Sequence, residues 1–319
     1  MKTFLCSLLF FGLSQDIAAQ QDTILVYLDK DEKPCSPHQA VYYSVQHKDR
    51  SAWKKLVFDM ADDKVEYVAY FQDSACTQFD GPYISFHKNG QYKTSGSYLQ
   101  NKKTGAWLSW TENKKLVDSA FYKNGFIHGL SLKWNNNGTV SDSLFFGEEG
   151  NGEGRGYWLD GKRRYQGHFI SGKKCGEWTY YHKNGNPSLV TIYANDSVGS
   201  YTCYDEEGKL QKKDCYYEKE ASYKGGDKAW MNYLSRRLSI VKLPAAYYSG
   251  EIYGTTMLQF IVDVDGRLTD VKVVKSVDPA LDEISLDIIR QSPKWEPAVQ
   301  YNRKVKAYRK QPITFSQPQ

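Results

Sequence analysis

The sequence is poor in proline and histidine, and its cysteines follow no metal-binding pattern. Only 10 of the 319 residues are proline, and no proline run occurs, which excludes an extended proline-rich spacer. The six histidines are scattered, and no Cys-x-x-Cys pair, Ser–His–acid or Cys–His arrangement stands out. The net charge of +5 comes from interspersed lysines and acids, without an arginine stripe. We therefore expect a non-enzyme with no cofactor, no metal, no bound nucleic acid and no directly bound small-molecule substrate.

Long apolar runs are also scarce, and the most prominent one lies at the N-terminus. Lys2 precedes an apolar stretch from Phe4 to Leu13, and Ala18-Ala19 offers a small-residue cleavage site. This pattern predicts a cleaved signal peptide over residues 1–19 and a periplasmic mature protein. The alternative is an inner-membrane anchor, but the run is shorter than the roughly 20 residues that a spanning helix needs.

The cysteine count leaves the disulfide pairing open. Of six cysteines, Cys6 falls within the predicted signal peptide, so the mature chain has an odd number. An odd number excludes a fully paired framework, although an exported protein would permit disulfides. Free buried thiols are the alternative. The candidate pairs are Cys35 with Cys76, or two among Cys175, Cys203 and Cys215.

Glycine and aromatic residues, in contrast, are abundant and form a repeat. A glycine is followed five residues later by an aromatic, and four further on usually by a second glycine, which in three copies belongs to an Asn-Gly pair. Six copies follow one another at intervals of 23 or 24 residues, beginning at Gly81, Gly105, Gly129, Gly152, Gly176 and Gly199. A fixed period of this kind indicates stacked copies of one small unit.

Each copy reads as one β-hairpin, since Asn-Gly suits a tight turn and a single hairpin is marginal in water. We expect the leading glycines, such as Gly105, Gly129 and Gly176, to start strands. The aromatics five residues later, such as Trp110, Trp134 and Tyr181, are expected to form a buried spine. The repeats span residues 81–217. Residues 20–80 are expected to be a degenerate capping lead-in, with strands near 24–28, 40–43 and 65–71.

The periodicity changes after Cys215. A polar stretch from Lys219 to Lys228 is typical of a linker, and apolar residues then recur at helical spacing from Trp230 to Leu238. Alternating apolar residues predict two further strands, Asp278-Pro279 predicts a helix start, and a last strand follows. The order is α-β-β-α-β over residues 218–319, with strands at 255–264, 268–275 and 305–315. The fold class is mainly β plus α+β.

The last strand is the candidate partner-binding site. Pro312 cannot donate a ladder hydrogen bond, which places this strand at a sheet edge. Its basic residues can protect the edge against aggregation, and the edge can also accept an extended peptide by strand addition. The candidate residues are Val305, Lys306, Ala307, Tyr308, Arg309, Ile313 and Phe315.

Two resemblances follow from these patterns. The repeats, with pieces such as FHKNGQYKTSG and HFISGKKCGEWTYYHKNG, resemble the bacterial variant of MORN repeats, a family of scaffolds without catalytic residues. The C-terminal region resembles the TonB C-terminal domain, the receptor-binding module of periplasmic energy transducers. The matching segments include FIVDVDG (260–266), VKVVKSVDPALD (271–282), PKWEPA (293–298) and PITF (312–315).

The second resemblance implies a protein partner. TonB-like domains engage outer-membrane receptors or other envelope proteins through the edge strand, in association with transmembrane transport. The alternative is a repeat scaffold of another class, in which the TonB-like domain only docks or forms a homodimer.

Overall fold

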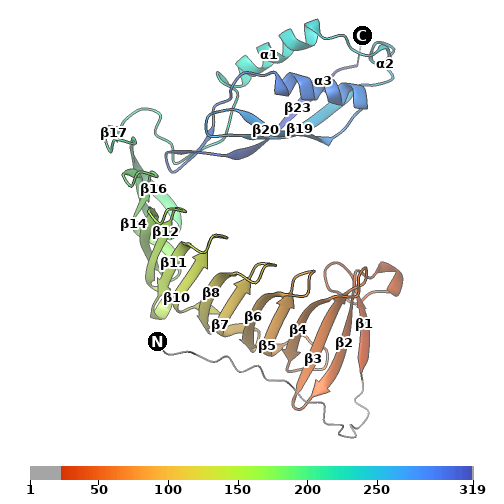
Figure 1. Cartoon of the computed structure of the whole chain (residues 1–319), viewed down its shortest axis with the longest axis vertical. Helices are drawn as coiled ribbons and strands as arrows, with labels where there is room; N and C mark the ends of the chain where they lie inside the picture. The colour runs from red at the N-terminus through yellow and green to blue at the C-terminus, as the bar shows by residue number, and fades with distance from the viewer. Residues whose placement is uncertain (1–22, 318–319) are drawn as a thin grey trace. The chain divides into compact units, whose positions relative to one another are not determined.

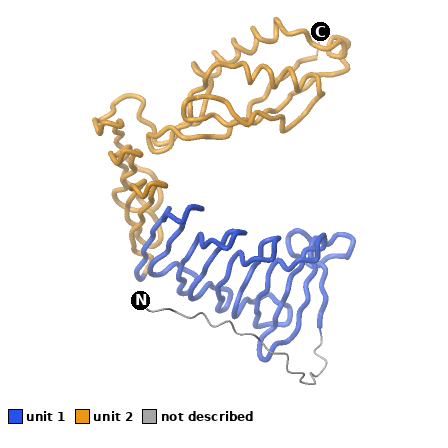
Figure 2. Tube along the Cα trace, viewed as in Figure 1, with its two compact units in different colours: residues 1–148 blue, residues 149–319 orange. Residues whose placement is uncertain are grey.

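A computed structural model describes residues 23–317 of the chain, which forms two compact units, residues 1–148 and 149–319 (Figure 2). The division falls within the repeats and so differs from the domain limits expected from the sequence. The predicted signal peptide, residues 1–19, lies outside the described residues. Within residues 23–317, no helix is long and apolar enough to cross a membrane.

The first unit is an antiparallel meander in which most strands pair with the next along the chain (Figure 1). The three expected lead-in strands are present, and a further strand, β3, lies between them. A 3-10 turn spans Pro37–Gln39 and another Glu148–Gly150. The strands are β1 (Ile24–Leu28), β2 (Tyr42–Asp49), β3 (Ala52–Asp59), β4 (Val65–Phe71), β5 (Phe79–Phe86), β6 (Tyr92–Leu99), β7 (Lys102–Trp110), β8 (Leu116–Lys123), β9 (Phe126–Ile127), β10 (Gly129–Trp134) and β11 (Val140–Phe146).

The second unit continues with hairpins of the same kind. Consecutive strands pair antiparallel from β12 to β17, so the prediction of one hairpin per repeat is confirmed. The strands are β12 (Gly152–Tyr157), β13 (Arg163–Ile170), β14 (Lys173–Tyr181), β15 (Pro187–Ala194), β16 (Ser197–Tyr204) and β17 (Leu210–Gln211).

The hairpin turns use a different geometry from the one expected. In the first repeat, His87 N–H donates to Gln91 O, and Gly90 N–H donates to His87 O, each at 2.8 Å. Gly90 has a φ of 79°, whereas Asn89 is not among the residues with positive φ. The loop is therefore a four-residue turn that ends in a left-handed glycine, and only the glycine of each Asn-Gly pair needs its conformational freedom.

The aromatic core lies at another register of the repeat than predicted. Trp107 and Trp178, two residues after their leading glycines, are buried, whereas Trp110, Trp134 and Tyr181 are only half-buried. The expected spine lies at the end of each first strand, next to the turn, where fewer neighbours cover it. The prediction of a buried spine at these positions is therefore wrong.

Glycines on the neighbouring strands make room for the buried tryptophans. A Cβ at Gly96 or Gly167 would come within 2.2 Å of the ring of Trp107 or Trp178. Each indole N–H also donates to a backbone carbonyl of that strand, at 3.1 Å. Gly105, in contrast, does not start β7 but lies inside it with a φ of 66°, and the register between β6 and β7 shifts beside it. Gly105 thus supplies a bulge, and Gly176 likewise lies inside its strand, whereas Gly129 starts β10 as predicted.

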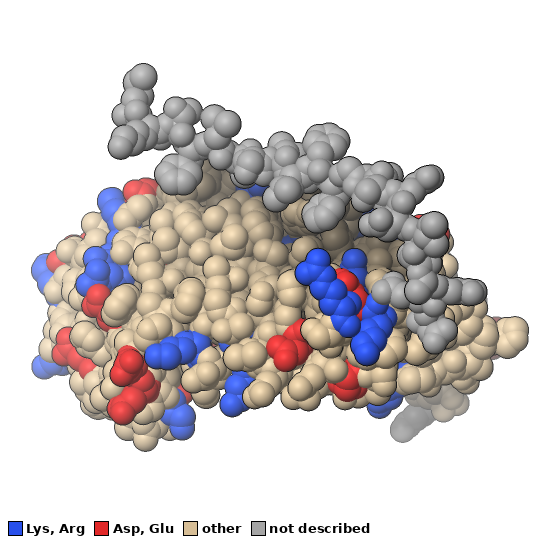
Figure 3. Space-filling model, turned by 90° about the horizontal axis from the view of Figure 1, so that it is seen from below, with Lys and Arg blue, Asp and Glu red and all other residues tan. Residues whose placement is uncertain are grey.

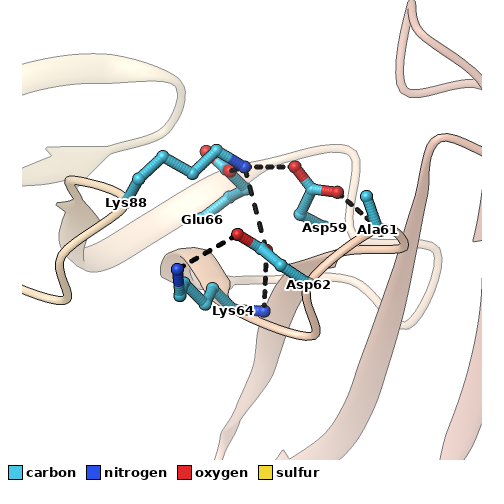
Figure 4. A network of polar contacts seen from close by, with 6 residues as sticks. All are labelled: Asp59, Ala61, Asp62, Lys64, Glu66 and Lys88. Atoms are coloured by element: carbon cyan, nitrogen blue, oxygen red, sulfur yellow. Dashed lines mark hydrogen bonds and ion pairs between the residues drawn. The ribbon is translucent and has the colours of Figure 1, made fainter.

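A small polar network joins the lead-in to the first repeat (Figure 4). Lys88, in the turn between β5 and β6, contacts Asp59 and lies 2.8 Å from the Glu66 carboxylate. Asp59 also accepts a hydrogen bond from Ala61 N–H at 2.8 Å. The Lys88 ammonium, followed by the Ala61 N–H, lowers the pKa of Asp59, so this carboxylate stays ionised into more acidic solution. More generally, both signs of charge are interspersed on the face drawn in Figure 3.

The C-terminal part of the second unit has the predicted α-β-β-α-β order, with the helices α1 (Gly226–Ile240) and α3 (Pro279–Arg290) (Figure 1). A short helix, α2 (Ala245–Tyr248), is additional. The main sheet has the order β20-β19-β23, formed by β20 (Leu268–Lys275), β19 (Gly254–Val262) and β23 (Ala307–Phe315). Its core includes residues from the sheet and from α3 that are fully buried: Leu258, Phe260, Val262, Leu281, Ile288, Ile289 and Ile313.

Local signals in the sequence account for these elements. Asp278 caps α3 as predicted, because its carboxylate accepts a hydrogen bond from Ala280 N–H at 2.8 Å and Pro279 follows. Gly266 has a φ of 83° in the β19–β20 turn, and a Cβ there would lie 2.1 Å from Trp295 O. Val264, which was expected to end this strand, lies beyond it and is exposed.

The segment predicted to be a linker is instead part of the fold. Residues Glu218–Lys219 form a strand, β18, that pairs with β21 (Ala298–Gln300), and β21 pairs with β22 (Arg303–Val305). Ala221 and Tyr223 are buried in the C-terminal core. The alternation of these apolar residues with Glu220 and Ser222 is the strand signal that was missed.

The tip of the β21–β22 hairpin contacts the last repeats. Tyr301 and Asn302 both have positive φ, as a two-residue hairpin turn requires. The Tyr301 ring stacks on Tyr180, with centroids 3.7 Å apart and planes inclined by 7°. The Asn302 side-chain amide donates to Tyr204 O and to the side-chain oxygen of Gln211, each at 3.0 Å. We call this set of contacts the junction.

A disulfide secures the same region. Cys203 and Cys215 are bonded, whereas Cys35, Cys76 and Cys175 are free thiols, which decides among the pairings left open above. Directly after the disulfide, the carbonyls of Tyr216 and Tyr217 accept hydrogen bonds from the backbone of the hairpin tip, at 2.9 and 2.7 Å. The disulfide therefore fixes the segment on which the tip rests.

The register of the aromatic core can be tested by two substitutions. We expect Trp178→Ala to lower the free energy of unfolding by about 3–5 kcal/mol, because the ring is 1% exposed and would leave a cavity. Trp134→Ala, at a half-buried ring, should cost about 1 kcal/mol. Urea denaturation followed by circular dichroism measures both. Equal losses would contradict the assignment of the core to the residue two positions after each glycine.

The junction can be tested by proteolysis. We expect Tyr301→Ala to speed tryptic cleavage at Lys212, Lys213 and Lys219 about tenfold. The reason is that removal of the stacked ring weakens the junction by roughly 1.4 kcal/mol, and cleavage follows the open population. Tyr308→Ala is the matched control, since this tyrosine belongs to the same domain and is exposed. The same slow cleavage in wild type and Tyr301→Ala would show that the stacking does not hold the junction.

Candidate partner-binding edge

The candidate site is the edge of the C-terminal sheet formed by β23. This strand pairs with β19 over nine consecutive residues, from Gly254 opposite Phe315 to Val262 opposite Ala307, without a register shift. Among the described residues, no other strand pairs with it. The predicted position of this strand at a sheet edge is therefore confirmed, and its second edge offers unpaired backbone groups.

The opposite edge of the sheet, β20, is irregular. Its pairing with β19 shifts register twice, between Met257 and Leu258 and between Gln259 and Ile261. Asp270, within β20, has a φ of 51°. Bulges of this kind twist an edge away from further pairing. Of the two edges, β23 is thus the one suited to accept another strand.

The predicted site residues do not all face solvent. Ile313 and Phe315 belong to the buried core, so their role is to anchor the strand. Tyr308 is 67% exposed, whereas Ala307 and Arg309 are half-buried. The single strand predicted over 305–315 is divided, because Val305 ends β22 and β23 begins only after Lys306.

A groove of about 530 Å³ runs beside the first half of β23. One side is formed by residues 305–310, which include most of the predicted site. The other side is formed by residues 218–221 and 298–300, and residues 219–221 among them were expected to belong to a linker. These residues form the groove because β18 pairs with β21.

Ion pairs hold three of the cations that line the groove. Lys219 lies 2.7 Å from Glu296, and Lys306 lies 3.2 Å from Asp263. The third pair joins Arg309 to Glu220, at 2.7 Å.

The first two pairs shift the pKa values of their members. The hydrogen bond from Lys219 to Glu296 raises the pKa of Lys219. The Val264 N–H and then Lys306 lower the pKa of Asp263. The groove itself is lined by charges of both signs, from residues 218–220, 306, 309 and 310.

Two known families match parts of the chain. Residues 242–316 match the sequence model of the Gram-negative bacterial TonB protein C-terminal, which covers both edges of the sheet but begins after α1. Residues 174–195 and 197–219 match the MORN repeat variant, that is, the hairpins nearest the junction. Among curated proteins, none matches the chain significantly. The chain therefore combines MORN-variant repeats with a TonB-like C-terminal domain.

Proposed function

We propose that this protein is a non-enzymatic periplasmic binding protein that engages TonB-dependent outer-membrane receptors, or another envelope protein, by strand addition to β23. The observation that carries the proposal is the unbroken pairing of β23 with β19 beside the bulged β20. The match to the TonB C-terminal model supports the class of partner. The same likeness supports an association with transmembrane transport.

The disulfide supports export. Cys203 and Cys215 pair close to the junction, and structural disulfides persist in oxidising compartments such as the bacterial periplasm. This agrees with the signal peptide predicted from the first residues. The repeats would then take the place of the proline-rich spacer that the sequence lacks, and hold the binding domain through the junction.

Strand addition along this groove gives a weak complex. About five backbone hydrogen bonds at a net 0.5–1.5 kcal/mol each must offset the cost of association. Transient binding suits a module that couples to a receptor and releases it. Self-pairing of two β23 strands, the homodimer alternative, is opposed by the exposed Lys310, which would bring like charges together on adjacent strands.

A peptide with selectively blocked amides tests strand addition without altering the protein. The probe is a synthetic N-terminal segment of a TonB-dependent receptor, together with two forms N-methylated at alternate residues. Since a paired strand directs only alternate amides toward its neighbour, one form should lose affinity at least about tenfold and the other should bind like the parent. Isothermal titration calorimetry measures the three affinities. Equal binding of all three peptides would exclude backbone pairing as the mode of recognition.

A further inference from the structure

The two side chains of the ion pair between Arg309 and Glu220 differ in their exposure to solvent. The Arg309 side chain is 29% exposed, whereas that of Glu220 is 86% exposed, and the two are joined at 2.7 Å. The guanidinium is therefore held within the wall of the groove, while the carboxylate reaches it from solvent.

The backbone on each side of Glu220 is fixed, whereas the Glu220 side chain can rotate. Lys219 belongs to β18, which pairs with β21, and Ala221 is buried in the core. Opening the ion pair needs no movement of β18, because a rotation of the Glu220 side chain suffices. Exposed ion pairs contribute only about 0.2–1 kcal/mol, so this opening is readily accessible.

The pair also stands where a partner strand would enter. Arg309 lies on β23 opposite Phe260 and lines the groove together with Ala307 and Tyr308. Glu220 lines the facing wall. An extended peptide that pairs with the first half of β23 therefore meets both side chains.

The other paired cations of the groove have more firmly held counter-charges. The Asp263 carboxylate that pairs with Lys306 also accepts a hydrogen bond from Val264 N–H at 2.7 Å. Lys219 pairs with Glu296, which follows the buried Trp295 and whose backbone bonds to Ser222. Arg309 is thus the cation whose partner is most easily exchanged, and a guanidinium binds an incoming carboxylate more strongly than a neutral group.

We propose that Glu220 is an internal stand-in for a carboxylate of the partner: it occupies Arg309 in the free protein and is displaced by an acidic side chain of the added strand. The proposal rests on the function proposed above and adds the chemistry of the partner, an extended peptide with an Asp or Glu that reaches Arg309. Arg309 then favours acidic peptides over neutral ones, and Glu220 is a latch that lowers their affinity by competing for the guanidinium.

The test measures the affinity of the receptor peptide and of forms in which each of its acidic residues is replaced in turn by the corresponding amide. Glu220→Gln should raise the affinity for the acidic peptide about twofold to fivefold. This is the factor expected when an exposed ion pair no longer competes with the peptide for Arg309. Glu218→Gln is the matched control, because this carboxylate lines the same groove without contacting Arg309. Any gain in affinity from the loss of its charge should be smaller than the gain in Glu220→Gln.

In wild type, one of the amide replacements should weaken binding, because the carboxylate that reaches Arg309 is lost. In Arg309→Gln, the peptide with that acidic residue and the peptide with its amide should bind equally, with a ratio of dissociation constants of about one. A gain equal for Glu218→Gln and Glu220→Gln, or an acid preference that survives in Arg309→Gln, would overturn the latch while leaving strand addition intact. If neither wild type nor Glu220→Gln binds any of the peptides, the proposed function fails together with the latch.

Discussion

Unpaired backbone groups at the edge of a β-sheet must be paired, bent away or left for a partner, and this constraint organises the structure. In the repeats, each hairpin closes the edge of the one before it, as in the unbroken succession from β2 to β8. In the C-terminal sheet, β20 is bulged at Asp270, whereas β23 pairs with β19 without a bulge. Within residues 23–317, the edge of β23 beside the groove is therefore the one best suited to pair with another strand.

The junction connects the C-terminal domain, which contains the β23 edge, to the last repeats. Tyr180 provides the platform for Tyr301 at a repeat position where the earlier copies have Ser85, Ser109, Lys133 and Gly156. A tyrosine at a left-handed turn position costs about 1–2 kcal/mol, which stacking and burial offset. The disulfide holds the receiving segment in place. A departure from the repeat thus coincides with the contact between the last repeats and the C-terminal domain.

Local sequence patterns predicted most of the helices and strands. The reason is that turns, helix caps and the alternation of apolar and polar residues in strands depend on residues close together in the sequence. The hairpins, the Asp278 cap and the edge position of β23 follow from such signals. The buried register of the aromatics could not be derived, since it depends on Gly96 and Gly167 of the neighbouring strands. The groove and the Glu220 contact were missed for a similar reason: β18 is two residues long, and its partner β21 lies far along the chain.

The most direct test of the central claim is hydrogen exchange of the backbone amides with and without the saturating receptor peptide. Strand addition predicts that exchange slows at least about tenfold within β23 (Ala307–Phe315), while β20 and the repeats over 81–217 are unchanged. Protection that appears in β20 or in the repeats, with β23 unaffected, would contradict the account.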